Sequence, residues 1–385
     1  MSENRLSANP PAAKKQSKLR SILSQSGVPI FFTLLCLVII IASKLDLNYL
    51  IGELISRLGR NLFIVLSLLI PVTAGLGLNF GIVIGAMSGQ ITLIIITFMQ
   101  LKGLFGFVSA LLISIPISML FGWIVGSIFN RAKGREMITG MIMGFFANGV
   151  YQLLFLMMLG TIIPVNMNTE VAQAIMLGNG VGLRNTIDLS NIYYSLDNVF
   201  MRLVNYIPGI EWNGIIWTDT FGPWRVPLGA FFMSAILCIF ITFIMKTKMG
   251  QNFRAIGQDM AIAEVSGIKV DKVRITAVIY STILAAWGQM IFLQNLGSLN
   301  TFNAHEQVGM FSVAALLVGG ASVKRASIWN AIIGVLLFHT LFVVSPLAGQ
   351  KLFGEPQIGE WFRQLISYSV IAVALAMHAI QSRKK

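Results

Sequence analysis

The sequence predicts an all-α fold, a polytopic membrane bundle of about ten transmembrane helices, and three observations lead to it. The 385-residue chain is 56% hydrophobic and only 11% charged, whereas soluble domains carry about 25% charged residues. The apolar residues form long blocks instead of amphipathic stripes, so lipid is the expected solvent. The basic residues fall in short clusters between these blocks, as they do in cytoplasmic loops.

Ten apolar blocks define the expected spans, because a helix needs about 20 residues to cross the hydrocarbon. The eighth block is short and contains Gly309, Gly319 and Gly320, so it is a candidate half-helix. The blocks cover residues 28–44, 62–78, 82–101, 104–128, 137–163, 225–246, 274–297, 308–320, 326–347 and 363–381.

The distribution of charge predicts which side of the membrane each loop faces. With the N-terminus inside, the inner segments hold 19 of the 28 basic residues but only five of the 15 acidic ones, so the inner face carries +14 and the outer face −1. This asymmetry follows the positive-inside rule and places both termini in the cytoplasm. We expect a basic cytoplasmic segment (1–27), a membrane domain (28–381) and a cytoplasmic tail (382–385).

Two of the loops stand out by length or composition. The outer loop, residues 164–223, is long for a compact protein, and long loops of this kind usually have a function. It is either a passive cap over the helices or a docking surface for a partner outside the membrane. The inner loop, residues 247–273, is shorter, basic and partly helical in pattern.

Several function classes find no support in the sequence. The net charge of +13 is spread over separate loops and does not form one patch, so we expect no nucleic-acid partner. Cys36 and Cys238 each lie in an apolar block, and two cysteines make neither a disulfide framework nor a zinc site. The phosphate-loop, H-E-x-x-H, G-x-S-x-G and C-x-x-C motifs are missing from the sequence. We therefore expect no catalysis, metal or cofactor on this chain.

The predicted spans carry no ionisable group near their middle. No Asp, Glu, Lys or Arg falls there, whereas ion-coupled transporters and proton relays usually need such groups at depth. His339 is the main titratable side chain inside a span, and we interpret it as a hydrogen-bonded packing residue. The sequence therefore favours an energy source outside this chain.

Neutral polar side chains take the place of charges inside the spans. Residues 71–90 contain repeated glycines, which either loosen a helix or let two helices approach closely. Irregular backbone at membrane depth must be buried in protein or line a cavity, so this region is either tight packing or one wall of a substrate path. Buried amides need partners, either one another or a neutral polar ligand. The residues assigned to the path are Asn79, Ser88, Gln90, Asn148, Gln152, Gln289 and Gln294.

Residues 249–288 contain a glycine, an Arg-Ala-x-Gly sequence, an alanine-rich turn and Gly-Ile before the next span. This pattern resembles the inner coupling loop of bacterial ABC importer permeases of the ribose, simple-sugar, nucleoside and branched-chain amino acid class. In that family the loop forms a short helix that docks into a groove of the ATPase. The matching residues are Gly250, Arg254, Ala255, Gly257, Ala261, Ala263, Gly267 and Ile268.

Two further segments carry the same resemblance. Residues 311–321 are an Ala- and Leu-rich run that ends in Gly319-Gly320, similar to the C-terminal segment of the family. Residues 135–148, in which Glu136 precedes a helix with threonine and methionine, and Leu78-Asn79-Phe80-Gly81-Ile82 are similar to the nucleoside and simple-sugar branch.

The resemblance implies a transport subunit and not an enzyme. It implies a multi-pass protein of the bacterial cytoplasmic membrane, with a second permease chain, a substrate-binding protein on the outer face, and surrounding lipid. ATP and Mg²⁺ would be bound by separate ABC ATPase subunits. The residues expected to couple this chain to the ATPase are Gly250, Arg254, Gly257, Asp259, Glu264 and Gly267.

The uncharged interior and the weaker family match favour a neutral, hydroxyl-rich substrate such as a simple sugar or a nucleoside. A branched-chain amino acid is the alternative substrate, because backbone amides and helix termini can hold a zwitterion. A gradient-driven transporter or channel is a second function class, and a membrane-embedded enzyme is a third.

Overall fold

The computed structural model describes residues 11–167, 169–199, 215–218 and 222–383. This part of the chain is helical apart from short strands and turns, and six of its helices are long and apolar enough to cross a membrane. Three shorter apolar helices accompany them. The predicted all-α membrane bundle is thereby confirmed in outline, and the chain is a multi-pass membrane protein. The number of spans and the side that each terminus faces stay predictions.

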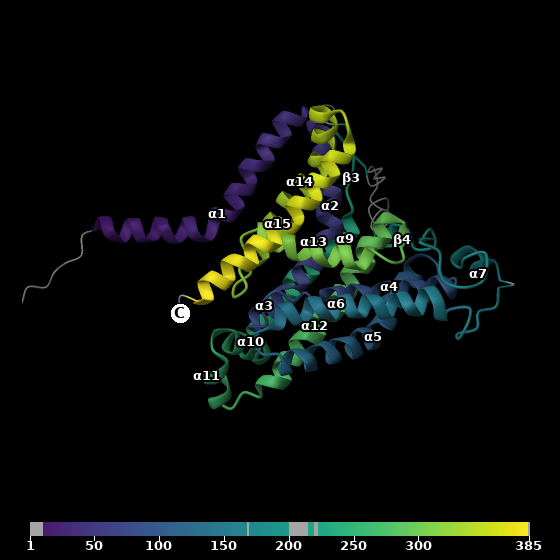
Figure 1. Cartoon of the computed structure of the whole chain (residues 1–385), viewed down its shortest axis with the longest axis horizontal. Coiled ribbons are helices and arrows are strands. Elements are labelled where there is room, and N and C mark those ends of the chain that lie inside the picture. The colour runs from purple at the N-terminus through teal and green to yellow at the C-terminus, as the bar shows by residue number, and fades with distance from the viewer. Residues whose placement is uncertain (1–10, 168, 200–214, 219–221, 384–385) are drawn as a thin grey trace, which may run out of the picture.

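The helices are α1 (Pro11–Ser43), α2 (Leu47–Ser67), α3 (Leu69–Thr73), α4 (Ile82–Phe98), α5 (Gly103–Arg131), α6 (Glu136–Leu153) with the π-helical turn η1 (Leu154–Met158), α7 (Glu170–Ile175), α9 (Leu228–Lys246), α10 (Lys248–Gln258), α11 (Met260–Val265), α12 (Val270–Leu296), α13 (Ala304–Val318), α14 (Ile328–Phe353) and α15 (Pro356–Arg383). In Figure 1, α4, α5 and α6 run alongside one another, whereas α2 and α14 cross them at a large angle.

The second predicted span, 62–78, is wrong at both ends. Helix α2 begins fifteen residues earlier, at Leu47, because its charged first half is satisfied inside the protein. Arg57 bonds to Glu53 at 2.7 Å and lies over the ring of Phe342, and Arg60 lies over Phe292. Such pairs let arginine lie among apolar helices. At the other end, the chain leaves helical geometry after α3, and residues 74–81 are irregular.

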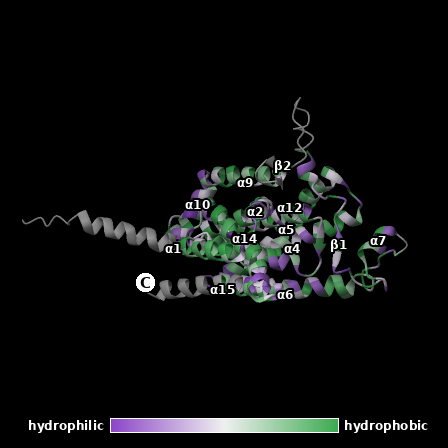
Figure 2. Ribbon diagram, turned by 90° about the horizontal axis from the view of Figure 1, so that it is seen from above, coloured by the Kyte–Doolittle hydropathy of each residue, from purple (hydrophilic) through white to green (hydrophobic). Residues whose placement is uncertain are grey.

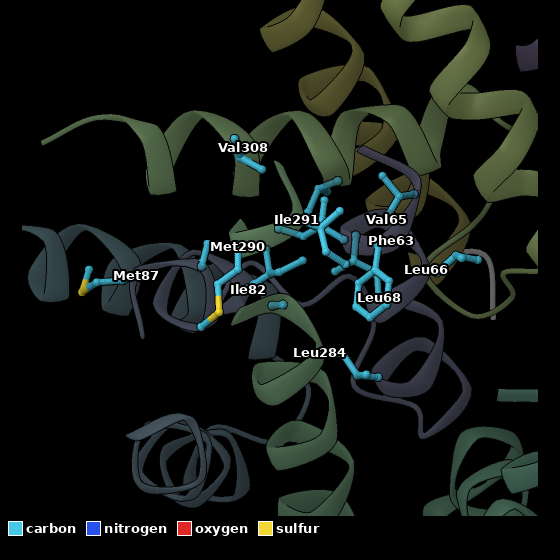
Figure 3. Packing of buried hydrophobic residues seen from close by; sticks show 14 of the residues in the cluster. Phe63, Val65, Leu66, Leu68, Ile82, Met87, Leu284, Met290, Ile291 and Val308 are labelled. Carbon is cyan, nitrogen blue, oxygen red and sulfur yellow. The ribbon is translucent and has the colours of Figure 1, made fainter. Parts of the chain in front are cut away.

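Helix α12 lies at the centre of the bundle and contacts α2, α4 and α5. Figure 3 shows the core between these helices and α13, with Phe63, Leu68, Ile82 and Met290 among the packed side chains. Glycines bring the helices close, because the missing Cβ lets backbones approach. Gly85 and Gly89 of α4 and Gly122 and Gly126 of α5 all lie against α12, and Gly288 of α12 lies against Ile64 of α2.

The two loops that stand out in the sequence lie at opposite ends of the bundle (Figure 1). One end carries α10 and α11 together with the turn between α5 and α6, where Lys133 pairs with Asp271 at 2.7 Å. The other end carries α7 and the short strands of the long loop. In Figure 2, hydrophilic residues colour α10, whereas α9 beside it is mostly hydrophobic. The two loops that the charge distribution assigns to opposite sides of the membrane thus lie at opposite ends of the bundle.

The long loop is joined to the connection between α12 and α13. Strand β1 (Thr186–Asp188) pairs antiparallel with β4 (Ser298–Asn300), and the Thr301 N–H donates to the Asn185 carbonyl at 2.8 Å. A second hairpin, β2 (Ile215–Thr218) with β3 (Gly222–Arg225), leads into α9. Residues 168, 200–214 and 219–221 of the predicted outer loop, and residues 1–10 and 384–385 of the predicted termini, lie outside the described part.

Candidate functional site

The irregular segment 74–81 is buried at a junction of three elements. Gly75 and Gly77 both have positive φ, at +72° and +71°, a conformation that glycine adopts without strain. Gly75 touches the backbone of Gly257 in α10, and Gly77 lies beside Met137 of α6 and Val323. The segment that leads into α4 is therefore in direct contact with the predicted coupling loop.

A polar cluster joins α4, α6 and α13. Its centre is His305, which is fully buried at the start of α13. The His305 Nδ1 lies 3.2 Å from Gln90 Oε1, and its Nε2 lies 3.1 Å from Asn148 Oδ1. Asn148 Nδ2 donates to Glu306 Oε2 at 3.0 Å, and Gln90 Nε2 donates to the Tyr151 hydroxyl at 3.0 Å. We call these five residues the His305 cluster.

The His305 cluster lies near the middle of the membrane-spanning helices. Gln90 is the central residue of α4, and Asn148 is one residue from the centre of the apolar helix Glu136–Met158. Glu306 bonds to Asn148, so its carboxylate lies at a similar depth. The prediction that no acidic residue reaches the middle of the spans is therefore wrong. The eighth predicted span begins at residue 308, but α13 begins at Ala304. Glu306 is therefore part of this helix and not of the preceding loop.

Next to the cluster lies a shallow, mostly apolar groove, which we call the Glu306 groove. Helices α4, α6 and α13 come close here because Gly144 of α6 and Gly309 of α13 both face Val83 of α4. Its volume is about 10 Å³, close to the space that one water molecule needs. The groove is lined by Phe80, Val83, Met141, Gly144, Phe145, Glu306 and Met310.

The structure brings together three of the seven residues assigned to a substrate path and separates the others from them. Gln90 and Asn148 belong to the His305 cluster, and Gln152 adds a 3.4 Å bond to Asn148. The other four are buried elsewhere. Asn79 lies 3.4 Å from Ser281 of α12, Ser88 lies 2.7 Å from Ser118 of α5, Gln289 finds no hydrogen bond among the described residues, and Gln294 lies beside Asp197.

Asp197 of the long loop caps helix α9 from outside. Its Oδ1 accepts the Gly229 N–H at 2.7 Å, in the first turn of α9, where Pro227 offers no side-chain cap. Burial raises the pKa of Asp197 above its ordinary value. The hydrogen bond from Gly229 and the nearby amides of Gln294 and Asn295 act in the opposite direction but offset only part of this rise. The folded chain therefore favours the protonated carboxyl more than the unfolded chain does.

Asp197→Asn is expected to raise the thermal unfolding temperature at pH 7.5, because it keeps an acceptor for Gly229 and removes the buried charge. The stability that Asp197 contributes is present below its ordinary pKa and is lost as the pH rises through the raised one. The gain should therefore shrink towards pH 4. Circular dichroism melts in detergent micelles measure it, and Asp188→Asn, on an exposed residue of the same loop, is the control. A gain of equal size at both pH values would contradict the assignment.

The predicted coupling residues form a helical hairpin with defined local roles. Thr247 caps α10 through the Gly250 N–H, and Asp259 caps α11 by accepting from the Ala261 and Ile262 N–H groups. Gly267 ends the hairpin with φ +82°, and Gly257 lies directly on the Thr73 backbone. Arg254 is exposed and donates to the Met245 carbonyl at 3.0 Å. Glu264 is exposed on α11.

Two apolar side chains of α11 were missed by the sequence analysis. Ile262 is 66% exposed and Val265 is 91% exposed, on a segment whose other face packs Ile256, Ala263 and Val270 into a small core of its own. Ile262 and Val265 are three residues apart, so they share one face of a helix, whereas Ala263 lies on another. This spacing could have identified an outward apolar face from the sequence. An exposed apolar surface on such a hairpin suits contact with another protein.

A buried ion pair ties this hairpin to α6. The fully buried Arg274 of α12 bonds to Glu136 at 2.5 Å. It also bonds to Asn130 at the end of α5, and lies 3.0 Å from the Met260 sulfur of α11. Four elements therefore meet at a single guanidinium group.

Comparison with known proteins identifies the family. The model for the permease component of the branched-chain amino acid transport system matches residues 50–375, which is most of the chain. The chain belongs to this permease family. The resemblance seen in the coupling loop is thereby confirmed, and the matched region includes the hairpin α10–α11, the His305 cluster and the Glu306 groove.

Individual relatives align over shorter stretches than the family model. The probable ABC transporter permease YphD of Escherichia coli is 28% identical over 41% of this chain and 46% of its own length. The ribose import permease RbsC of Bacillus subtilis is 28% identical over 40% and 45%. The nucleoside ABC transporter permease NupC of Lactococcus lactis is 24% identical over 68% and 72%. The chain thus spans about half the length of two of these relatives. No solved structure matches it.

Proposed function

We propose that this chain is the permease subunit of an ATP-driven ABC importer for a neutral, hydroxyl-rich solute such as a simple sugar or a nucleoside. The observation that carries the proposal is the hairpin α10–α11 of a family permease, which presents Ile262 and Val265 away from its own core. The substrate class follows the relatives named for ribose and nucleosides.

The hairpin touches the substrate side of the bundle along two routes. Gly257 of α10 lies on Thr73 and Gly75, directly before the segment that leads into α4 and Gln90. Met260 of α11 lies against Arg274, which holds Glu136 at the start of α6. A displacement of the hairpin would therefore move the two helices that carry Gln90 and Asn148.

The partners follow from the same reading. ABC ATPase subunits, which bind ATP and Mg²⁺, dock on the hairpin, and this chain itself binds no cofactor. A second permease chain completes the path, and a substrate-binding protein delivers the solute at the end that carries the long loop. The protein resides in the cytoplasmic membrane of a bacterium, surrounded by lipid, with Gly250, Arg254, Gly257, Asp259, Glu264 and Gly267 shaping the coupling hairpin.

Two alternatives have their own observations. A branched-chain amino acid is the substrate named in the description of the family model. A gradient-driven transporter gains support from Glu306, since carboxylates at membrane depth often serve ion or proton coupling. Uptake into proteoliposomes that contain the permease, its ATPase and its binding protein separates these readings. If the proposal is correct, uptake of the sugar or nucleoside needs ATP, supplied inside or outside the vesicles, and continues in the presence of a proton and sodium ionophore. Uptake that is abolished by the ionophore alone would overturn the proposal.

Ile262→Asp with Val265→Asp is expected to weaken ATPase docking strongly, because a charge replaces the apolar contact at an exposed site. Co-purification of the ATPase with the detergent-solubilised permease should fall at least about tenfold, which corresponds to about 1.4 kcal/mol. The matched control is Ser266→Asp, on an exposed neighbour in the same turn. Equal recovery of the ATPase with all three substitutions would place the docking surface elsewhere.

A further inference from the structure

We propose that the face formed by α4, α6 and α13 lines the aqueous translocation path, and that Glu306 and Asn148 bind the hydroxyl groups of a neutral solute in the Glu306 groove. This inference rests on the proposed function and adds to it the wall of the path and the ligand class at that wall. The test measures water access to the groove and protection of the groove by ligands. A failure of this inference can therefore be distinguished from a failure of ATP-driven uptake.

The first step is the exposure of polar groups at membrane depth. Glu306, Asn148 and Gln152 are all partly exposed, and the first two lie level with the middle of the apolar helix Glu136–Met158. A carboxylate in that place faces the protein interior or a water-filled cavity, because the cost of placing it against lipid tails is several kcal/mol. The face that exposes these groups is therefore not covered by lipid.

The second step is a comparison with another exposed surface of the same chain. The middle of α9 exposes Ile236, Ile239 and Phe240, which is the composition that lipid contact requires. The middle of α6 also exposes apolar side chains, such as Phe145 at 56%, but mixes them with the polar residues named above. Two exposed faces, each near the middle of its helix, thus differ in chemistry.

The third step is the chemistry of the groove. Glu306 Oε2 accepts a hydrogen bond from Asn148, and its other oxygen makes no hydrogen bond with the described residues, so it is available to accept from a ligand. Phe80 and Phe145 line the same groove as Glu306. Apolar and aromatic walls with a few placed polar groups are typical of small-molecule sites. A hydrogen-bond acceptor in a groove lined by aromatic side chains suits a neutral molecule with several hydroxyl donors.

The fourth step concerns size. The groove holds about one water molecule in this structure, so it must widen before a solute of the size of a sugar fits. Helix α13 has 15 residues, a length of about 22 Å, which is shorter than the hydrocarbon of about 30 Å. The second permease chain proposed above would supply the opposite wall.

Thiol labelling of the full-length permease in nanodiscs tests water access. In a background with Cys36→Ala and Cys238→Ala, one variant carries Phe145→Cys in the groove and the control carries Ile239→Cys on α9. With membrane-impermeant thiosulfonates, Phe145→Cys is expected to react at least about tenfold faster than Ile239→Cys. Equal, slow reaction at both positions would place lipid over the groove and overturn the proposal.

The same variants test the carboxylate and the ligand. A cationic thiosulfonate should label Phe145→Cys several-fold faster than an anionic one, and Glu306→Gln should remove the difference. Millimolar ribose, galactose or uridine should slow the labelling, and Glu306→Gln should abolish this protection. Equal rates for the two reagents, or protection by none of the three solutes, would overturn the role of Glu306. Neither result depends on ATP.

Discussion

Arg274→Met is expected to lower the free energy of unfolding by about 3–5 kcal/mol, because it leaves a buried carboxylate without its counter-charge. Arg274 is fully buried and its partner Glu136 is nearly so. The substitution also removes the bonds to Asn130 and the contact with Met260. Thermal unfolding in detergent micelles, followed by circular dichroism, measures the loss.

The control for this prediction lies in the neighbouring turn. Lys133 and Asp271 form an ion pair of similar length whose side chains are 42% and 63% exposed, and exposed pairs contribute at most about 1 kcal/mol. Lys133→Met should therefore change the unfolding temperature little. Adding Glu136→Gln to Arg274→Met should recover part of the loss. If Arg274→Met unfolded at the same temperature as Lys133→Met, burial would not strengthen this pair.

Gly257→Val is expected to reduce ATP-driven uptake at least tenfold, about 1.4 kcal/mol or more in the driving step, at normal membrane abundance. A side chain at this position would collide with the Thr73 carbonyl and the backbone of Gly75, so α10 would be pushed away from the segment that leads into α4. ATP hydrolysis by the reconstituted complex should persist while uptake falls. Both rates are measured on the same proteoliposomes.

Gly134→Asn is the matched control for Gly257→Val. Gly134 lies at the same end of the bundle with φ +82° and no neighbouring atom near its absent Cβ, and asparagine tolerates this conformation better than most residues. Uptake should therefore stay near the wild-type rate. Uptake by Gly257→Val at the wild-type rate would show that the contact between α10 and the Thr73 backbone is not needed for coupling.

Hydrophobic blocks predicted the class of the fold but not the start of α2. Residues 47–60 contain Glu53, Arg57 and Arg60, which lower the local hydropathy and suggest a loop. In the structure these side chains are satisfied by each other and by rings of α12 and α14. A hydropathy profile does not include such tertiary contacts, so it places the end of the span at the charged residues.

The amide residues of the candidate site were predicted from the sequence, but the histidine at its centre was not. Gln90 and Asn148 were selected as polar groups inside apolar blocks, whereas His305 and Glu306 stand just before the eighth block and were counted as loop residues. The bonds that unite them span 215 and 158 positions of the sequence, and a single sequence does not report contacts at that separation. The useful signal was the pair His305-Glu306 beside a block too short to span the membrane.

The pairing of β1 with β4 joins the long loop to the segment that leads into α13. Three backbone pairs fix residues 186–188 to residues 298–300, and the chain then needs only five residues to reach His305. The link from β1 to the first turn of α13 thus consists of the backbone hydrogen bonds of this pairing and a short stretch of chain, and not of side-chain contacts. A change in the conformation of the long loop at β1 would therefore be felt directly at the turn of α13 that carries Glu306.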